Sequence, residues 1–231
     1  MFRHCCDRLE SAACAALIVA LLSGCAVVEA PEGGQRRGAS AEAPLAEPSA
    51  RRYPARVEAD GQSGFTVTEV AGISGSARSV YQDALVLLAR EDYAGGIPLL
   101  TRVTEEAPEV TTPFVDLGIA HARSGDLQAA ESSLRAALER TPDHPVANNE
   151  LGIVYRKTGR FEQARKSYEQ ALAVQPEFHY ARRNLAVLCD LYLADLACAA
   201  RNYSAYLEVV PDDRDAQIWL ADIRTRLGTS E

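Results

Sequence analysis

The side chains best suited to chemistry in this sequence are four histidines and six cysteines, and their spacing argues against catalysis. His121, His144 and His179 are too scattered for metal-ligand spacing, and no Cys-x-x-Cys pair accompanies them. The sequence also lacks a phosphate-binding glycine loop, paired catalytic carboxylates and a nucleophile elbow. We therefore expect a protein that is not an enzyme and that holds no metal or cofactor.

Cys25 is the cysteine whose neighbours indicate a specific modification. An apolar run at residues 12–22 follows Arg3 and Arg8 and ends at Leu22-Ser23-Gly24-Cys25. The run is too short to span a bilayer core of ~30 Å, and its charged start and small final residues are typical of a secretory signal peptide. The ending also resembles the bacterial lipoprotein signal, which implies cleavage before Cys25 and acylation of that residue. A plain signal peptide is the alternative.

The lipoprotein resemblance also implies a location. Several acyl chains on Cys25 would anchor the protein stably, because a single chain binds membranes only marginally. In Gram-negative lipoproteins an Asp after the acylated Cys tends to retain the protein in the inner membrane. Ala26 stands there instead. We therefore expect an outer-membrane lipoprotein that faces the periplasm.

Three segments precede the regular part of the chain. Residues 1–24 are expected to be the signal peptide, and residues 25–64 a disordered tether. The tether is rich in Ala, Pro, Glu, Gly and Arg and has too few large apolar residues to offset chain entropy. Residues 65–76 form a lead-in whose apolar residues alternate with polar ones. This pattern fits either a short strand or an extended segment.

The elements that would position any site repeat every 34 residues. The composition, with 47% apolar but only 6% aromatic residues, favours close-packed helices over a sheet. Prolines end the second helix of each pair, because proline lacks the backbone donor and disfavours helix in the residue before it. The period is carried by Leu117-Gly118, Gly125, Ala130, Ala137 and Pro142, which recur as Leu151-Gly152, Gly159, Ala164, Ala171 and Pro176.

This pattern resembles the tetratricopeptide repeat. The resemblance implies an all-α fold, a right-handed superhelix (α-solenoid) of about four helix pairs with a C-terminal capping helix. Gly118 and Gly152 would lie where the two helices of a repeat cross closely. The expected repeats are residues 77–110, 111–144, 145–178 and 179–212, followed by a capping helix and tail at 213–231.

The fourth repeat is less regular and contains two cysteines. Pro211 follows Pro176 by 35 residues rather than 34, so one residue has been added, most economically in the turn Leu193–Asp195. Cys189 lies late in the first helix of this repeat and Cys198 early in the second. Antiparallel helices bring such positions close together, and an exported protein can form the disulfide. Two buried thiols that act as small apolar residues are the alternative.

The remaining candidate site is the concave groove, which the resemblance assigns to the exposed faces of the first helices. Its basic side chains stand out in a chain of formal charge −8. Together with two asparagines they could hold the carboxylates and backbone of a partner. An ordinary solvated face is the alternative. The candidate residues are Arg123, Asn149, Ile153, Arg156, Lys157, Tyr180, Arg183, Asn184 and Val187.

These features favour a lipid-anchored adaptor that binds an envelope protein or peptide and assists assembly of an envelope complex, similar in layout to pilotin lipoproteins. The negative net charge argues against a nucleic-acid partner. A non-catalytic scaffold or accessory subunit for peptidoglycan enzymes, or for an envelope energy-transduction complex, is the alternative.

Overall fold

The computed structural model describes residues 55–59, 65–69, 72–73 and 75–228, all within one compact unit that spans residues 46–231. The expected signal peptide, Cys25 and most of the expected tether lie outside the described residues. Among the described helices, none is both long and apolar enough to cross a membrane. The structure therefore bears on the repeat array and on the short segment that leads into it.

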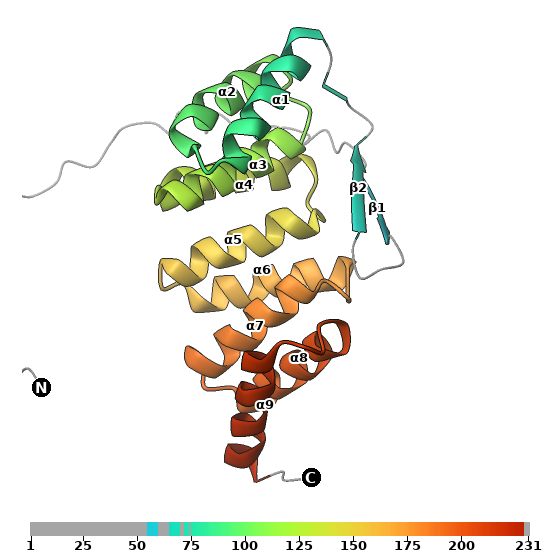
Figure 1. The fold of residues 1–231 in the computed structure, drawn as a ribbon, viewed down its shortest axis with the longest axis vertical. Coiled ribbons are helices and arrows are strands. Elements are labelled where there is room, and N and C mark those ends of the chain that lie inside the picture. Colours follow the sequence, from blue (N-terminus) through green and yellow to red (C-terminus); the bar gives the residue numbers. More distant parts are fainter. Residues whose placement is uncertain (1–54, 60–64, 70–71, 74, 229–231) are drawn as a thin grey trace, which may run out of the picture. The chain divides into compact units, whose positions relative to one another are not determined.

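An antiparallel hairpin precedes the helices (Figure 1). β1 (Ala55–Ala59) pairs with β2 (Phe65–Glu69), and Val57 lies opposite Val67. Partly buried and exposed residues alternate along β2, as the two-residue period of a strand requires. The lead-in thus contains a strand, which is one of the two forms that its alternation allowed.

The prediction of a disordered tether at residues 25–64 is wrong at its C-terminal end, because residues 55–59 form β1. Residues 25–64 contain few large apolar residues overall, yet residues 55–59 pair their backbone with β2 as a strand. The hairpin also contacts the array, since the Phe65 ring lies edge-on to the Phe178 ring with centroids 4.9 Å apart. The described end of the lead-in is therefore part of the folded unit.

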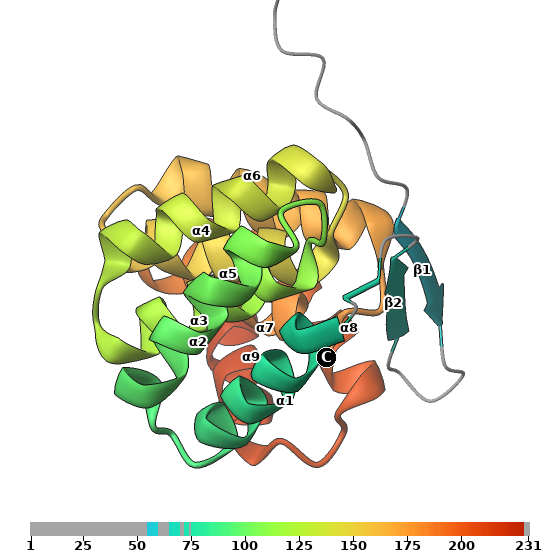
Figure 2. The same cartoon turned by 90° about the horizontal axis from the view of Figure 1, so that it is seen from above.

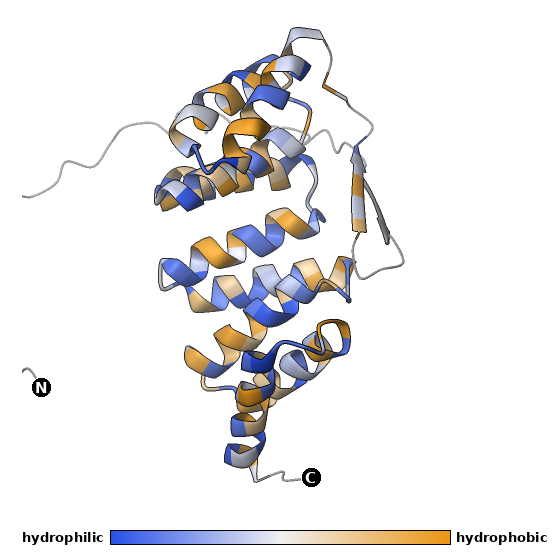
Figure 3. Cartoon of the chain, viewed as in Figure 1, coloured by the Kyte–Doolittle hydropathy of each residue, from blue (hydrophilic) through white to orange (hydrophobic). Residues whose placement is uncertain are grey.

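Helices make up almost all of the described chain, and each packs against the next in sequence order (Figures 1 and 2). Apolar positions recur along every helix (Figure 3), so each helix can bury one face against its neighbours. The pairs are α1 (Gly75–Ala89) with α2 (Tyr93–Glu106), α3 (Thr112–Ser124) with α4 (Leu127–Arg140), α5 (Pro145–Lys157) with α6 (Phe161–Val174), and α7 (His179–Leu191) with α8 (Leu196–Val209); α9 (Arg214–Leu227) ends the array.

Two glycines allow the paired helices to approach closely. A methyl group added to Gly118 would lie 2.6 Å from Cγ of Leu134, and one added to Gly152 would lie 2.5 Å from Cε1 of Tyr168. Real side chains do not tolerate such distances, so a larger residue at either position would force the helices apart. This confirms the expected role of the small residues in the period.

The turns inside the repeats share one backbone feature. The second residue before each second helix (Glu91, Gly125, Gly159 and Ala194) adopts a left-handed conformation, which favours glycine. Gly125 has φ 95° and Gly159 has φ 77°, whereas Ala194 in the fourth repeat has φ 53° without being glycine. Since Leu191 follows Lys157 by 34 residues and Leu196 follows Phe161 by 35, the added residue lies between Leu191 and Leu196.

α9 corresponds to the first helix of a fifth repeat, and no second helix follows it among the described residues. It follows α5 by 69 residues, and its buried Ala216, Leu220 and Ile223 match buried positions of α5. On the face where α5 packs against its second helix, α9 is exposed or partly exposed. On this face the buried Asn148, Gly152 and Tyr155 of α5 correspond to exposed Gln217, exposed Ala221 and partly exposed Arg224 of α9.

Candidate partner-binding groove

The candidate groove residues lie on α3, α5 and α7, which are the first helices of the second, third and fourth repeats. α5 contacts both α3 and α7 directly, so the three helices form a continuous layer. Arg123 and Lys157 are exposed in the last turns of α3 and α5, where a cation also complements the negative end of the helix dipole. These two cations are accessible to a partner.

The two asparagines are already engaged with each other. Nδ2 of Asn184 donates to Oδ1 of Asn149 at 2.9 Å, and Nδ2 of Asn149 donates to Oε1 of Glu150 at 3.0 Å. Asn149 is buried and Asn184 partly buried. The pair therefore ties α5 to α7, and a partner would have to exchange these bonds or use the remaining polar atoms of Asn184.

The apolar candidates serve mainly the core. Ile153 and Val187 are partly buried and pack against the main hydrophobic cluster. Tyr180 differs from them, because its side chain is 61% exposed on the first turn of α7. Of the three, Tyr180 offers the largest surface to a partner.

Arg156 occupies an unusual environment at the end of α5. Its guanidinium lies over the ring of Tyr192, 5.9 Å from the centroid, and near the hydroxyl of Tyr168. Within the described residues, neither Nε of Arg156 nor the Tyr168 hydroxyl has a well-aligned hydrogen-bond partner, although both atoms are buried. Buried donors of this kind are costly unless an acceptor reaches them.

Arg183 is held at the junction of the fourth repeat with α9. Its Nε lies 3.7 Å from Oδ2 of Asp213, and its guanidinium lies 5.3 Å from the centroid of the Trp219 ring. Tyr206 donates a hydrogen bond to the same carboxylate oxygen at 2.7 Å. Burial and the neighbouring Asp213 raise the pKa of Tyr206 to about 12, so the phenol remains protonated at physiological pH. Arg183 thus helps to fasten the capping helix.

Sequence reasoning missed the carboxylate that sits among the groove cations. Burial raises the pKa of Glu150, and the Asn149 amide together with the charges of Arg123 and Lys157 opposes this rise. Glu150 therefore moderates the positive field at the centre of the groove. Glu150 follows Asn149 in the sequence and lies 27 residues after Arg123, which is on a neighbouring helix. Nothing in this spacing indicates that the carboxylate lies among the groove cations.

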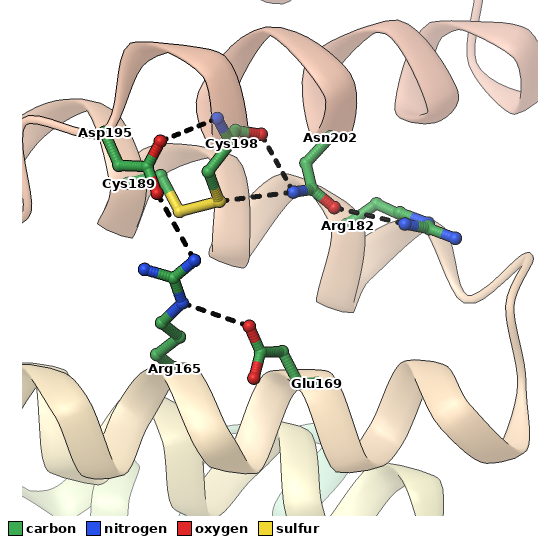
Figure 4. Close-up of a disulfide and its surroundings, with 7 residues drawn as sticks. All are labelled: Arg165, Glu169, Arg182, Cys189, Asp195, Cys198 and Asn202. Atoms are coloured by element: carbon green, nitrogen blue, oxygen red, sulfur yellow. Dashed lines mark hydrogen bonds and ion pairs between the residues drawn. A yellow bond between two sulfur atoms is a disulfide. The ribbon is translucent and has the colours of Figure 1, made fainter.

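The two cysteines of the fourth repeat meet as expected (Figure 4). The sulfur atoms of Cys189 and Cys198 lie 2.06 Å apart and the Cα atoms 5.9 Å apart, and both side chains are buried. Asp195 caps α8 by accepting from the Cys198 amide at 2.9 Å, and Nη2 of Arg165 lies 3.3 Å from the other oxygen of that carboxylate. The α7–α8 turn is thus fixed at both ends.

The first repeat has a separate cleft beside the hairpin. Glu69 of β2 accepts from the amides of Thr111 and Thr112 at 2.7 Å each, and so supplies the N-terminal cap that α3 lacks from its own residues. A cleft of about 420 Å³ adjoins this contact. Its lining includes Val67, Glu69, Ile73, Arg78, Tyr81, Gln82, Leu85, Val110 and Thr112.

Stacked helix pairs with small residues at each crossing define an α-solenoid. Residues 109–177 match the tetratricopeptide repeat family. Residues 109–177 are therefore tetratricopeptide repeats, as the 34-residue period predicted.

Several solved structures share the fold. MamA 41-end from Desulfovibrio magneticus RS-1 is 20% identical with a TM-score of 0.61, and the match covers 68% of this chain and 89% of that one. TTC0263, a thermophilic TPR protein of Thermus thermophilus, is 23% identical with a TM-score of 0.55, over 64% and 81%. Pseudomonas aeruginosa pilF is 18% identical with a TM-score of 0.59, over 65% and 68%. No curated protein matches the sequence. These identities support the fold and carry no function.

Proposed function

We propose that the protein is a lipid-anchored adaptor of the bacterial envelope that binds a segment of another envelope protein in its groove. In this role it assists assembly of an envelope complex, as a pilotin does. The coarser part rests on the fold, because tetratricopeptide arrays are scaffolds for protein interaction and are generally not catalytic.

Arg156 is the observation that carries the groove proposal. The Arg156 guanidinium is partly buried beside the hydroxyls of Tyr168 and Tyr192, and its remaining donors can bind an acceptor that a partner brings. A carboxylate or a backbone carbonyl of a partner provides that acceptor. Exposed Lys157 lies on the same helix end and favours an acidic group.

Photo-crosslinking tests the groove. We place p-benzoylphenylalanine at Tyr180 in the groove, or at exposed Gln170 on α6 as the matched site outside it. We expect one envelope protein to crosslink at Tyr180 and not at Gln170, and the crosslink to disappear in Arg156→Gln. Arg135→Gln, which removes a 65% exposed arginine on α4, serves as the control and should leave the crosslink intact. Equal crosslinking at both positions, or a crosslink that survives Arg156→Gln, contradicts the proposal.

The anchor is proposed from the sequence at Cys25. We expect metabolic incorporation of a labelled fatty acid into the wild-type protein, and none into Cys25→Ala. Fractionation of the labelled protein with the outer membrane supports the proposed location. Labelling that persists in Cys25→Ala shows that the assignment is wrong.

Export also bears on the paired cysteines. In an oxidising compartment we propose that Cys189 and Cys198 form a disulfide, since their Cα separation of 5.9 Å lies in the usual range. Alkylation of the denatured protein should modify these two thiols only after reduction. Modification without reductant would exclude the bond.

A further inference from the structure

The α7–α8 turn differs from the other turns inside the repeats. At its start, Leu191 is 68% exposed and the adjacent Tyr192 is 43% exposed. At the corresponding places the other described repeats have Ala89-Arg90, Arg123-Ser124 and Lys157-Thr158, none of which is a large apolar residue. Single exposed apolar residues are common on protein surfaces, but two adjacent ones on a projecting turn are not required by folding.

This turn is also built more firmly than its neighbours. It contains the added residue of the fourth repeat and is bracketed by Cys189 and Cys198. Asp195 accepts from the α8 amide of Cys198 and pairs with Arg165 of α6, which holds the turn to the preceding repeat (Figure 4). A contact surface that is rigid before binding loses less conformational entropy on binding.

The Tyr192 ring packs against two side chains of the preceding repeat. It lies against the Phe161 ring with centroids 4.8 Å apart, and against the Arg156 guanidinium at 5.9 Å. Leu193, by contrast, packs against the main hydrophobic cluster. The turn therefore keeps one apolar residue for the core and presents two to the solvent. Aromatic residues fixed in this way are frequent among the residues that dominate binding energy.

The charges around Leu191 and Tyr192 indicate the kind of partner. Two carboxylates near the turn are already paired, Asp190 with Arg226 at 3.0 Å and Asp195 with Arg165 at 3.3 Å. Lys157 is exposed at the end of α5, next to Arg156. The exposed Glu162 lies in the first turn of α6, where it complements the helix dipole. Beside Tyr192, Arg156 and its neighbour Lys157 supply positive charge, and Glu162 supplies one negative charge.

We propose that Leu191 and Tyr192 form a docking tip for a partner protein segment that carries one large apolar side chain close to a carboxylate. The apolar side chain packs against Leu191 and the Tyr192 ring, and the carboxylate approaches Lys157. The tip adjoins the groove at Arg156 and Lys157, and Leu191, which the groove proposal does not use, distinguishes the two sites.

Selection from a displayed library of random twelve-residue peptides tests the tip, with the full chain in detergent as the target. We expect enriched peptides to combine a large apolar residue with Asp or Glu within a few positions. Synthetic copies should bind Leu191→Asp about tenfold more weakly, as loss of a central apolar contact does. Lys157→Glu should weaken the same peptides.

Gln170→Asp adds the same charge at an exposed site of α6 and should leave binding unchanged. Circular dichroism melting of each variant confirms that it is folded, which we expect because Leu191 is largely exposed. No enrichment, enrichment of peptides without acidic residues, or equal binding to Leu191→Asp overturns the proposal. Binding that depends on Leu191 only with phosphatidylglycerol-containing vesicles, and not with peptides, identifies a membrane contact and also overturns it.

Discussion

The third and fourth repeats use the same positions differently. Tyr168 of the third repeat and Tyr203 of the fourth occupy equivalent positions, and both are buried. Tyr168 packs against Gly152, whereas the fourth repeat has Ala186 at the position of that glycine. The third repeat thus depends on close approach of two helices. The fourth accommodates a methyl group there and adds the Cys189–Cys198 contact and the Tyr206–Asp213 bond. Regular repeats are held by complementary shape, and an irregular one needs specific local links.

Gly152→Val should break this comparison most strongly. The new side chain would have to enter space that the Tyr168 ring already fills, and we expect the free energy of unfolding to fall by about 3 kcal/mol. Ala186→Gly removes the methyl group at the equivalent position of the fourth repeat and should cost only about 1 kcal/mol, mainly through helix propensity. Urea unfolding followed by circular dichroism measures both. Similar losses for the two variants would show that the helix crossings are equivalent after all.

Removal of the link between Cys189 and Cys198 should have the second-largest effect on the free energy of unfolding. If the bond forms, Cys189→Ala with Cys198→Ala should lower the free energy of unfolding by about 2–3 kcal/mol, given the short loop that the bond closes. Reductant should lower the melting temperature of the wild type and have little effect on the double variant. A wild type that is insensitive to reductant would count against the bond.

The third repeat has a pH dependence of its own. Nδ1 of buried His144 accepts from the Ala147 amide at 3.2 Å and so caps α5. Burial lowers the pKa of His144 to about 4, below the ordinary 6.5 of the unfolded chain. The unfolded state therefore binds the proton more readily, and stability that is complete above pH 6.5 is lost as the pH falls toward 4.

We expect this loss to be of order 2 kcal/mol between pH 7.5 and 4.5. His144→Asn retains a capping side chain without a titrating group and should remove that part of the pH dependence. Denaturant titrations at several pH values provide the measurement. An identical pH profile in both proteins would mean that His144 does not titrate as its burial implies.

The smallest expected changes in stability come from substitutions in the turns inside the repeats. Ala194→Gly should stabilise the protein by about 1 kcal/mol, because glycine adopts φ 53° without the cost that a Cβ atom imposes. The reverse change, Gly159→Ala, should destabilise by about the same amount, since no atom lies within 4 Å of the added methyl and only the backbone conformation opposes it. Effects of the same sign in both variants would remove this distinction between the repeats.

The sequence was most informative where one residue type recurs for one physical reason. Gly118 and Gly152 mark where two helices of one repeat approach closely, and the prolines mark where its second helix ends. The period therefore predicted the array and the approach of Cys189 to Cys198. Glu150, Asp213 and Tyr192 acquire their roles from contacts between repeats, which depend on side-chain direction. β1 was missed because a strand of five residues is defined by its partner and leaves little trace in composition.

The bond from Glu69 to the start of α3 has a mechanical consequence. A force applied to the chain before residue 55 reaches the hairpin before it reaches α1. Glu69 transmits it to Thr111 and Thr112, while Phe65 transmits it to Phe178. The load is therefore shared between the start of α3 and the start of α7, and α1 is not peeled from the end of the stack.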